Sequence, residues 1–495
     1  MTRLRAAALP GLPGDIGRPG YDRQAVRTGV VHLGIGAFHR AHQATLFDAA
    51  LAAGDERWGI CGVSLRSADV RDQLAPQDGL YSLVERDATG ERVRVIGAVR
   101  QVLVAPEDPE AVIAALASPD VHLVTLTITE KGYRLAGDAL DFADPAIVHD
   151  LATPTAPQSA VGFLVAGLAR RRAAGLPPFT ALSCDNLPRN GHLLRDAVLA
   201  FADRLDPALA RWIATKGAFP QAMVDRIVPA TTGSDIAALA TRLGCEDRAM
   251  VKTEPFCQWV IEDRFCGPRP DFAALGAQLT ADIAPWEEAK LRLLNGGHSA
   301  IAYLGGLAGI DHVHEFVARA DGRRFVERLW AESATTLSPP AELDLVRYRG
   351  ALMARFANPA LMHRTRQIAM DGSQKLPQRL LAPIARRLDR GQGIDALALA
   401  VAAWMRWQDG HDDAGLAFAV EDPLAAITAE AVLRGGTPRE RVTNLLRIGT
   451  IFPARLAQDE AFRAPLVAHL ARLEDLGADA AIADSREASR VSEGR

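Results

Sequence analysis

The sequence predicts an α/β domain followed by a mainly α-helical domain, and three observations lead to this prediction. Short apolar runs alternate with helix-like stretches in the first half of the chain, which is the pattern of βαβ units and a parallel sheet. Strand-like runs nearly vanish from about residue 285 onward. The length of 495 residues exceeds what one domain usually holds, at roughly 150 residues per domain. We therefore expect two domains, residues 1–284 and residues 285–495.

Five apolar runs are the expected strands of the first domain. They are Val30–Leu33, Ile60–Leu65, Val93–Val99, His122–Ile128 and Thr180–Cys184. Between them, Ala44–Ala53 and Ala111–Ala117 fit helices, and in the second domain Ala396–Arg406 and Pro465–Leu476 do so. A nearly continuous apolar strand such as His122–Ile128 is typical of a sheet that is covered on both faces.

The composition excludes several classes of function. Hydrophobic residues make up 48% and charged residues 23%, as in ordinary globular proteins. The formal net charge of −4 argues against a nucleic-acid partner, because such proteins usually carry a basic excess. No apolar run is long enough for a signal peptide or a membrane helix, and the five cysteines form no disulfide pattern. We expect a soluble cytoplasmic protein, and the composition says nothing further about its function.

A glycine-containing turn follows the first expected strand. It reads Gly34-Ile35-Gly36-Ala37-Phe38 and runs into a candidate helix. The first glycine permits a tight turn, and the second lets the backbone approach a pyrophosphate at the start of the helix. The third glycine position of the fingerprint is occupied by His39, so a purely structural turn is the alternative. The location directly after the first strand favours a Rossmann-type dinucleotide-binding domain.

Two further segments are expected to contact the cofactor. Asp69 follows the second strand, where its carboxylate would bind a ribose hydroxyl and repel a 2′-phosphate, which favours NAD over NADP. The alternative is that Asp69 only caps the helix Val70–Leu74. Thr129 and Glu130 follow the fourth strand at the carboxyl edge of the sheet, where ligands gather.

A lysine, an asparagine and a histidine share one expected helix that starts after Pro285. At about 100° per residue, Lys290 and His298 lie about 80° apart, and Asn295 and His298 lie about 60° apart. One helix can therefore present all three side chains to one cleft. The alternative is a surface lysine, a capping asparagine and a packed histidine.

These residue types suit proton transfer at a carbinol oxygen. Burial of Lys290 beside Trp286 would lower the lysine pKa toward neutrality, as a general acid/base requires. Asn295, and Asn186 after the fifth strand, are neutral donors for an oxygen that gains negative charge. His298 could hold the substrate hydroxyl or the lysine.

Several strings resemble the signatures of the long-chain mannitol dehydrogenase family. They are Gly34–Gln43, Ser183–Asn186, Met223–Pro229, Glu254–Phe256 and the set Lys290, Asn295 and His298. The resemblance implies a metal-free, NAD-dependent polyol or hexuronate oxidoreductase with a Rossmann-type domain and a helical C-terminal domain. It implies that Lys290 is the general acid/base and that Asn186 and Asn295 form the oxyanion site. It further implies that Asp225 supports the lysine or the substrate and that Glu287 is a proton relay.

One segment bears on the choice of substrate within that family. Mannitol dehydrogenases tend to carry an arginine where this chain has Gln367, and the pattern around it resembles fructuronate reductases. His363, Arg364 and Lys375 offer charge or donors for a sugar-acid carboxylate, although Lys375 occurs in both branches. We expect reduction of D-fructuronate to D-mannonate in a cleft between the domains. The alternative is a mannitol or arabinitol 2-dehydrogenase that acts on uncharged polyols and ketoses.

A different class of protein is an NAD-binding sensor without catalytic activity. Such a sensor would be expected to lose the lysine or its partners, yet all of them are present. The histidines at 39, 42, 312 and 314 lack the third ligand and the spacing of a zinc site, so we expect no metal.

Overall fold

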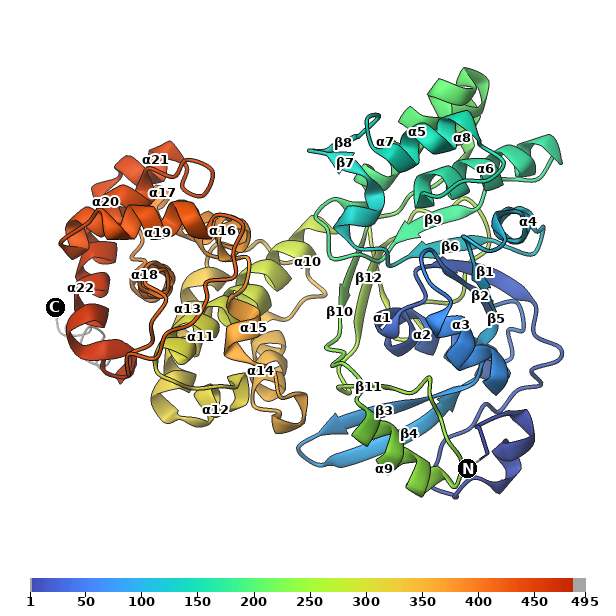
Figure 1. Cartoon of the computed structure of the whole chain (residues 1–495), viewed down its shortest axis with the longest axis horizontal. Coiled ribbons are helices and arrows are strands. Elements are labelled where there is room, and N and C mark those ends of the chain that lie inside the picture. Colours follow the sequence, from blue (N-terminus) through green and yellow to red (C-terminus); the bar gives the residue numbers. More distant parts are fainter. Residues whose placement is uncertain (1, 484–495) are drawn as a thin grey trace. The chain divides into compact units, whose positions relative to one another are not determined.

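The computed structural model describes residues 2–483. The chain divides into two compact units, Met1–Ile283 and Ala284–Arg495 (Figure 1). Among the described residues, every strand lies in the first unit, and the second unit is built from helices. The predicted class, an α/β domain followed by a mainly helical one, is confirmed.

A five-stranded parallel sheet forms the centre of the first unit, in the order β5-β2-β1-β6-β9. Its strands are β1 (Thr28–Leu33), β2 (Gly59–Ser64), β5 (Val99–Val104), β6 (Leu123–Leu126) and β9 (Thr180–Ser183). The strand order reverses between β1 and β6, which pair in parallel. Ligands of such sheets bind at this switch point, beyond the carboxyl ends of the strands.

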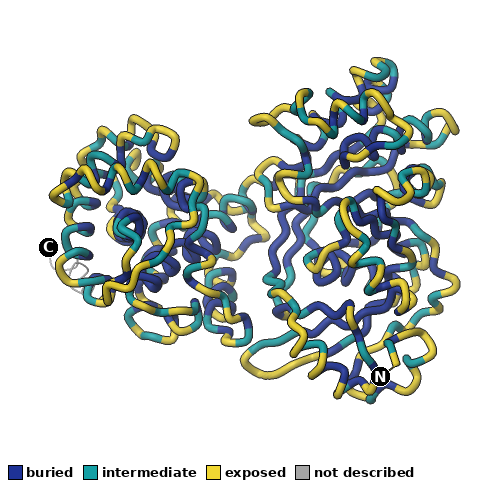
Figure 2. Tube along the Cα trace, in the orientation of Figure 1, coloured by how far each residue is buried: buried dark blue, intermediate teal, exposed yellow. Residues whose placement is uncertain are grey.

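Both faces of this sheet are buried, as the near-continuous apolar strands predict. Val31 and Leu33 of β1 belong to a core with α4 (Pro109–Ala117), α6 (Ala160–Ala173) and α7 (Asn190–Leu205). Val30, which points to the opposite face, belongs to a second core with α2 (Gln43–Ala52). In Figure 2 the strands run as buried segments through the middle of the unit.

The expected strand Val93–Val99 is wrong as a single element. The chain forms β4 (Gly90–Ile96), breaks at Gly97 and Ala98, and then begins β5. β4 pairs with β3 (Tyr81–Asp87) in a small sheet that also contains β11 (Val251–Thr253). A Cβ at Gly97 would lie 2.8 Å from Pro19 and 2.9 Å from the Tyr21 hydroxyl, so the chain passes too close to its neighbours there for a side chain.

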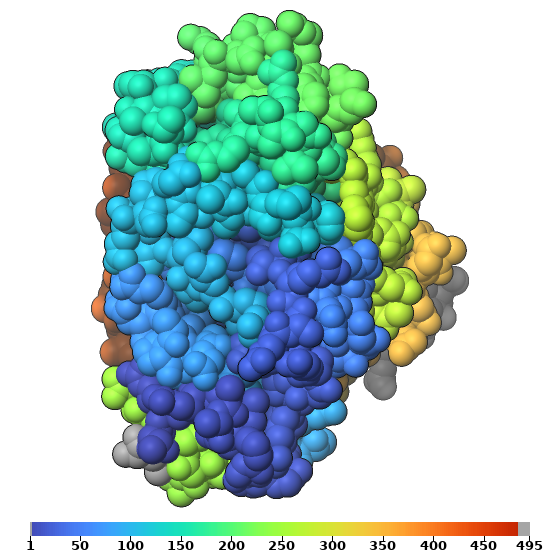
Figure 3. All heavy atoms as spheres, turned by 90° about the vertical axis from the view of Figure 1, so that its right-hand side faces the viewer, coloured from blue at the N-terminus to red at the C-terminus, as the bar shows by residue number. Residues whose placement is uncertain are grey.

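The remaining elements of the first unit surround these sheets. A third sheet has the order β10-β12-β13 and consists of β10 (Ala222–Asp225), β12 (Gln258–Glu262) and β13 (Gln278–Thr280). The others are α1 (Ala37–Ala41), α3 (Asp69–Leu74), α5 (Pro145–Ala152), α8 (Pro207–Lys216), α9 (Gly233–Leu243), β7 (Leu135–Ala136), β8 (Ala139–Leu140) and the short turns η1 (Ala6–Gly11), η2 (Ala75–Gln77) and η3 (Glu130–Tyr133). Figure 3 shows one face of this unit, with N-terminal segments in blue at the bottom and the region of α5 to α8 in green at the top.

The second unit is organised around α11 (Gly296–Leu307), in which every residue is buried. α11 follows α10 (Ala284–Ala289) and the π-helical segment η4 (Lys290–Asn295). Its other long helices are α13 (Ala320–Ala334), α14 (Leu345–Phe356), α18 (Asp395–Trp407) and α22 (Glu460–Ala483). The shorter elements are α12 (Val313–Ala318), η5 (Pro359–Leu361), α15 (Thr365–Ala369), α16 (Gly372–Leu376), η6 (Pro377–Leu381), α17 (Ala382–Asp389), α19 (Ala425–Leu433), α20 (Pro438–Leu446) and α21 (Ala454–Gln458). None of the helices within residues 2–483 has the length and apolar character needed to cross a membrane.

Candidate active site

A groove of about 310 Å³ opens at the switch point of the parallel sheet. It is lined by Gly34, Ile35, Gly36, Ser64, Leu65, Arg66, Ser67, Val70, Thr127, Ile128, Thr129, Gly132, Arg134, Gln158, Ser159 and Ala160. These residues follow the ends of β1, β2 and β6, which is where a Rossmann-type sheet binds its ligand. A second hollow of about 600 Å³ shares four of them, among them Arg66 and Arg134, and reaches His149.

The two glycines of the predicted turn differ in what surrounds them. Gly34 has φ +93°, and a Cβ there would lie 2.2 Å from the carbonyl oxygen of Thr127. Gly36 is exposed, and a Cβ there would meet only the Gly34 oxygen, at 3.9 Å. The backbone at Gly36 is therefore open to the groove, as the close approach of a pyrophosphate requires. Ala37 and Phe38 begin α1 and are not among the residues that line the groove.

A buried histidine beneath the turn was missed by the sequence reasoning. The His32 ring lies with Nδ1 2.7 Å from the Thr125 hydroxyl and Nε2 3.1 Å from the carbonyl oxygen of Gly34. Since that carbonyl can only accept, Nε2 carries the proton and Nδ1 accepts from Thr125. Burial lowers the pKa of His32 to about 3, so the ring stays neutral and joins β1 to β6 beside the groove. In the sequence, the position of this polar residue inside an apolar strand was the signal that could have identified it.

Thr129 lines the groove in a strained backbone conformation. Its φ of 63° is rare for a β-branched residue. The Asp185 carboxylate accepts hydrogen bonds from the Thr129 amide at 2.8 Å and the Ile128 amide at 3.1 Å, and it also accepts one from the Tyr133 hydroxyl at 2.7 Å. Burial raises the pKa of Asp185. Asp185 therefore supports the groove from behind, whereas Glu130 is exposed and does not line it.

Asp69 does not line the groove. It is the first residue of α3, and its carboxylate accepts a hydrogen bond of 2.8 Å from the Ser67 hydroxyl. Ser67 and Arg66 line the groove at the end of β2. Asp69 thus acts on that end of the groove through Ser67, and its role in selecting NAD over NADP stays a prediction.

The residues present fit a dinucleotide. The open backbone at Gly36 suits the pyrophosphate, and the second hollow beyond β2 leaves room for a nucleoside. The predicted cofactor residues Gly34, Ile35 and Thr129 line the groove with it.

A second residue missed from the sequence joins two predicted site segments of the first unit. Asn186 follows β9, and Asp225 ends β10. The Asn190 amide donates to the carbonyl oxygens of Asp185 at 3.0 Å and Ala222 at 2.7 Å, and it accepts from the Ala222 amide at 3.1 Å. These bonds hold the segments of Asn186 and Asp225 next to each other. The 32-residue separation of Asn190 from Ala222 hides this link in the sequence.

In the second unit, the segment from Lys290 to Asn295 is π-helical instead of α-helical. The Gly296 amide donates to the carbonyl oxygen of Leu291, five residues earlier. In an α-helix Lys290 and Asn295 would lie about 140° apart, whereas the wider turn of i→i+5 bonding brings residue i+5 much closer to the face of residue i. The π-helical turn therefore places Lys290 and Asn295 on one side. Single π-helical turns are frequent at functional sites.

The predicted catalytic residues of this unit are nearly enclosed. Lys290 is 8% exposed, Asn295 is 9% exposed and His298 is 7% exposed. Among the described residues, the Asn295 amide nitrogen has no hydrogen-bond partner, so its N–H groups are available to a ligand. Glu287 lies in α10, three residues before Lys290, and is half-buried.

His298 packs between two rings, with ring centroids 4.5 Å from Phe356 and 4.9 Å from His363. Burial lowers the pKa of His298 well below its usual value, and it lowers the pKa of His363 to about 4. Both rings are therefore neutral at physiological pH. A neutral imidazole can both donate to and accept from a substrate hydroxyl.

The cations predicted to bind a carboxylate have different surroundings. The Lys375 ammonium donates to the carbonyl oxygens of Met370 and Ile368 and lies 3.9 Å from Asp371. Arg364 and Gln367 are exposed near the start of α15.

Arg379 was not predicted. Its Nη1 donates to the Ser299 hydroxyl at 3.1 Å, and no carboxylate among the described residues pairs with it. Burial lowers the pKa of Arg379 to about 10. Its place one helical turn after Lys375 was the available signal. No group of three potential metal ligands occurs among the described residues.

Comparisons with known proteins cover nearly the whole chain. A model of the mannitol dehydrogenase Rossmann domain matches residues 28–274, and a model of the mannitol dehydrogenase C-terminal domain matches residues 282–474. The chain is 47% identical to an uncharacterised oxidoreductase of Escherichia coli over 457 residues, which are 91% of this chain and 93% of the relative. It is 43% identical to the D-mannonate oxidoreductase of Escherichia coli over 492 residues, which are 98% of this chain and 100% of the relative.

A solved structure shows the same architecture. The mannitol 2-dehydrogenase of Pseudomonas fluorescens, in a ternary complex with NAD and D-mannitol, is 37% identical, covers 100% of both chains and has a TM-score of 0.83. Both family models and these relatives agree with the motifs in the sequence. The protein therefore belongs to the mannitol dehydrogenase family of NAD-dependent oxidoreductases.

Proposed function

We propose that this enzyme reduces the keto group of D-fructuronate to D-mannonate with NADH and catalyses the reverse oxidation. The similarity to a D-mannonate oxidoreductase supports the substrate. The dinucleotide groove of the first unit and the lysine segment of the second unit support the reaction type. The observation that carries the choice of a sugar acid over a neutral sugar is Arg379, a half-buried cation that donates to the neutral hydroxyl of Ser299 and pairs with no carboxylate among the described residues.

The bound cofactor supplies a hydride to the keto carbon. We assign the proton to Lys290, whose Nζ would donate it to the carbonyl oxygen as negative charge develops there. The free Asn295 amide would donate a hydrogen bond to the same oxygen, since the π-helical turn places it on the side of Lys290. Asn186 is assigned the same donor role, and Glu287 that of the proton relay.

The neutral His298 would orient a substrate hydroxyl, and Asp225 would support the lysine or the substrate. The charge of Arg379 acts on both His298 and Lys375, so the guanidinium lies near the predicted substrate residues of this unit. A guanidinium matches a carboxylate with two parallel hydrogen bonds. Binding a substrate carboxylate would supply the anion that Arg379 lacks among the described residues.

Replacing Arg379 by glutamine tests this choice. Hydrogen bonds to charged groups contribute about 1.5–3 kcal/mol, so Arg379→Gln should raise the KM for D-fructuronate by about tenfold or more. The KM for D-fructose, which has no carboxylate, should change little. Arg347→Gln is the matched control at an exposed arginine of α14 that has no proposed role in the site. An equal loss with both substrates would show that Arg379 does not recognise the carboxylate.

Oxidation of an uncharged polyol is the second candidate. The solved mannitol 2-dehydrogenase, which holds D-mannitol, favours it. The same measurement separates the candidates, because a polyol dehydrogenase should prefer D-fructose to D-fructuronate in both the natural enzyme and Arg379→Gln.

A further inference from the structure

The π-helical turn that carries Lys290 and Asn295 is held by a side chain from another helix. The indole nitrogen of Trp330, in α13, donates a hydrogen bond of 2.8 Å to the carbonyl oxygen of Leu293, in the middle of the turn. The Gly296 amide is shared between the carbonyls of Leu291 and Leu293, so the backbone bonding of this turn is irregular. The Trp330 indole is thus a second donor to the Leu293 carbonyl oxygen, and it comes from outside the turn.

A second contact fixes the same turn to the end of α13. Arg292 donates to the carbonyl oxygen of Thr336 at 2.8 Å, and it pairs with Glu288 at 2.9 Å. Leu293 accepts the hydrogen bond from Trp330, and Arg292 donates the one to Thr336. Two successive residues of the turn are therefore bonded to α13 or to the chain directly after it. The turn is thereby restrained against rotation about its own axis.

The close approach of Trp330 depends on a glycine. A Cβ at Gly297 would lie 2.9 Å from the Trp330 indole nitrogen and 3.2 Å from the Phe356 ring. The ring centroids of Trp330 and Phe356 are 5.5 Å apart, and Phe356 also packs against His298. Gly297 is where the indole meets the helix that follows the π-helical turn.

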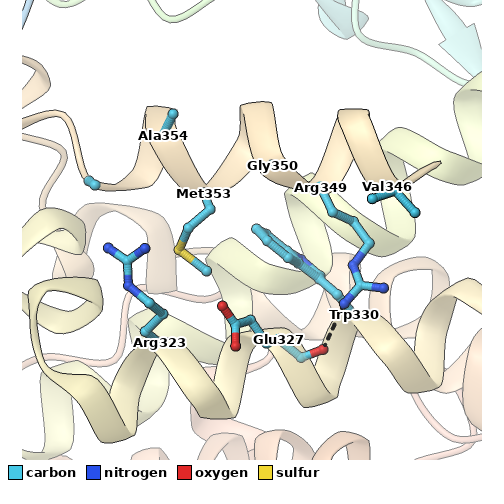
Figure 4. Close-up of a pocket in the computed structure, with 9 residues that line it drawn as sticks. Arg323, Glu327, Trp330, Val346, Arg349, Gly350, Met353 and Ala354 are labelled. Atoms are coloured by element: carbon cyan, nitrogen blue, oxygen red, sulfur yellow. Dashed lines mark hydrogen bonds between the residues drawn. The ribbon is translucent and has the colours of Figure 1, made fainter. Parts of the chain in front are cut away.

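On its other side, Trp330 borders a groove of about 560 Å³ between α13 and α14. Figure 4 shows the indole beside Met353 and Arg349, with Glu327 on the same helix as Trp330. Arg349 donates to the backbone oxygen of Glu327 at 3.2 Å. Trp330 is only 1% exposed, so packing and the hydrogen bond to Leu293 together hold the indole in place.

We propose that Trp330 is a positioning residue, whose indole N–H keeps the segment Lys290–Asn295 in its π-helical form and so keeps Asn295 on the side of Lys290. If the turn relaxed to α-helical bonding, the residues before and after it would rotate relative to each other by about 100°, the angle of one residue. Asn295 would then point away from the oxygen that Lys290 protonates. This inference rests on the roles proposed above for Lys290 and Asn295.

Trp330→Phe tests the inference, because it keeps an aromatic ring and removes the N–H group. We expect kcat to fall by about tenfold or more with little change in KM, since a donor to the developing oxyanion acts mainly in the transition state. The pH profile of kcat should shift, because the surroundings of Lys290 change. NADH affinity should stay as in the natural enzyme, since the cofactor groove lies in the first unit.

The matched control is Trp407→Phe. Trp407 also packs against α11, where it would meet a Cβ at Gly306 at 2.6 Å, but it makes no hydrogen bond to the π-helical turn. Both variants should lose similar thermal stability, and only Trp330→Phe should lose kcat. Gly297→Ala, which pushes the indole away, should reproduce the loss of kcat and keeps the test valid if Trp330→Phe does not fold.

Two outcomes distinguish the possible failures. If Lys290→Ala abolishes activity while Trp330→Phe and Gly297→Ala keep the natural kcat and pH profile, the inference about Trp330 is wrong and the proposed function stands. If Lys290→Ala keeps full activity, the proposed role of the lysine is itself wrong. Partial recovery of kcat in Trp330→His, which restores a ring N–H, would support the hydrogen bond as the cause.

Discussion

Burial determines the charge of the histidines around both parts of the site. His32 below the glycine turn and His298 beside His363 are held neutral by desolvation. Each is then able to act as one donor and one acceptor, which is how His32 joins Gly34 to Thr125. Because burial disfavours the protonated form of these histidines, acid lowers the stability of the folded protein.

We predict that the free energy of unfolding decreases as the pH falls below about 6.5, the pKa of histidine in an unfolded chain. The folded pKa values of about 3 for His32 and about 4 for His363 are lowered, so only the unfolded chain takes up these protons. Stability is therefore lost progressively from pH 6.5 toward these values, by roughly 1 kcal/mol per pH unit for each histidine. Above pH 7 the two residues contribute no pH dependence.

Urea unfolding between about pH 7 and pH 5 measures how steeply the free energy of unfolding changes with pH. His32→Gln should be less stable at pH 7 but less sensitive to acid, by roughly 1 kcal/mol per pH unit. The same substitution at the exposed His411 is the control. An unchanged slope in His32→Gln would show that His32 is not the buried neutral group described here.

Among the residues of the site, those with recognisable chemistry could be predicted from the sequence. Lys290, Asn295 and His298 were predicted because their types and spacing suit proton transfer, and their roles stay predictions. Asn190 and Arg379 were not, because each acts through a partner that is distant in the chain: Ala222 for Asn190 and Ser299, 80 residues away, for Arg379. Folding, and not local pattern, brings such pairs together.

At the scale of elements, two turns position the site, and both depart from regular geometry. The turn after β1 needs φ > 0 at Gly34, and the turn before α11 is π-helical. The sequence indicated the first through its glycines. It did not indicate the second, since an α-helical period was assumed for Lys290 to His298. The strand expected at Val93–Val99 failed because the prediction continued it through Gly97 and Ala98, where the chain breaks between β4 and β5.

Substitutions at the two glycines of the turn should have different effects, one on cofactor binding and the other on stability. Gly36→Ala should leave the thermal stability nearly unchanged, because a Cβ there meets only the Gly34 oxygen at 3.9 Å, but it should weaken NADH binding by occupying the groove. Gly34→Ala should destabilise the fold by about 3 kcal/mol or more, through the left-handed φ and the Cβ contact of 2.2 Å with Thr127.

Fluorescence titration with NADH, together with thermal unfolding, compares the two variants. If Gly36→Ala bound NADH as tightly as the natural enzyme, the pyrophosphate would have to lie elsewhere. If Gly34→Ala were as stable as the natural enzyme, the turn would not need its left-handed residue.

At the scale of the whole molecule, the two units contribute different parts of the proposed chemistry. The first contains the dinucleotide groove, and the second contains Lys290, Asn295 and the cations at Lys375 and Arg379. The α/β class, the helical second part and the family could be predicted from the sequence, because glycine turns, strand alternation and catalytic motifs are local patterns. The net charge of −4 does not attract an anion, so under the proposed function a few side chains such as Arg379 have to recognise the carboxylate.

The most direct test of the central claim is the rate of NADH oxidation by the natural enzyme with D-fructuronate, D-tagaturonate, D-fructose and D-xylulose. If Arg379 binds the carboxylate, kcat/KM for D-fructuronate should exceed that for D-fructose by about tenfold or more. A higher kcat/KM for D-fructose would contradict the assignment to sugar acids and favour a polyol dehydrogenase. NADH binding without oxidation by any of the four substrates would contradict the proposed catalysis altogether.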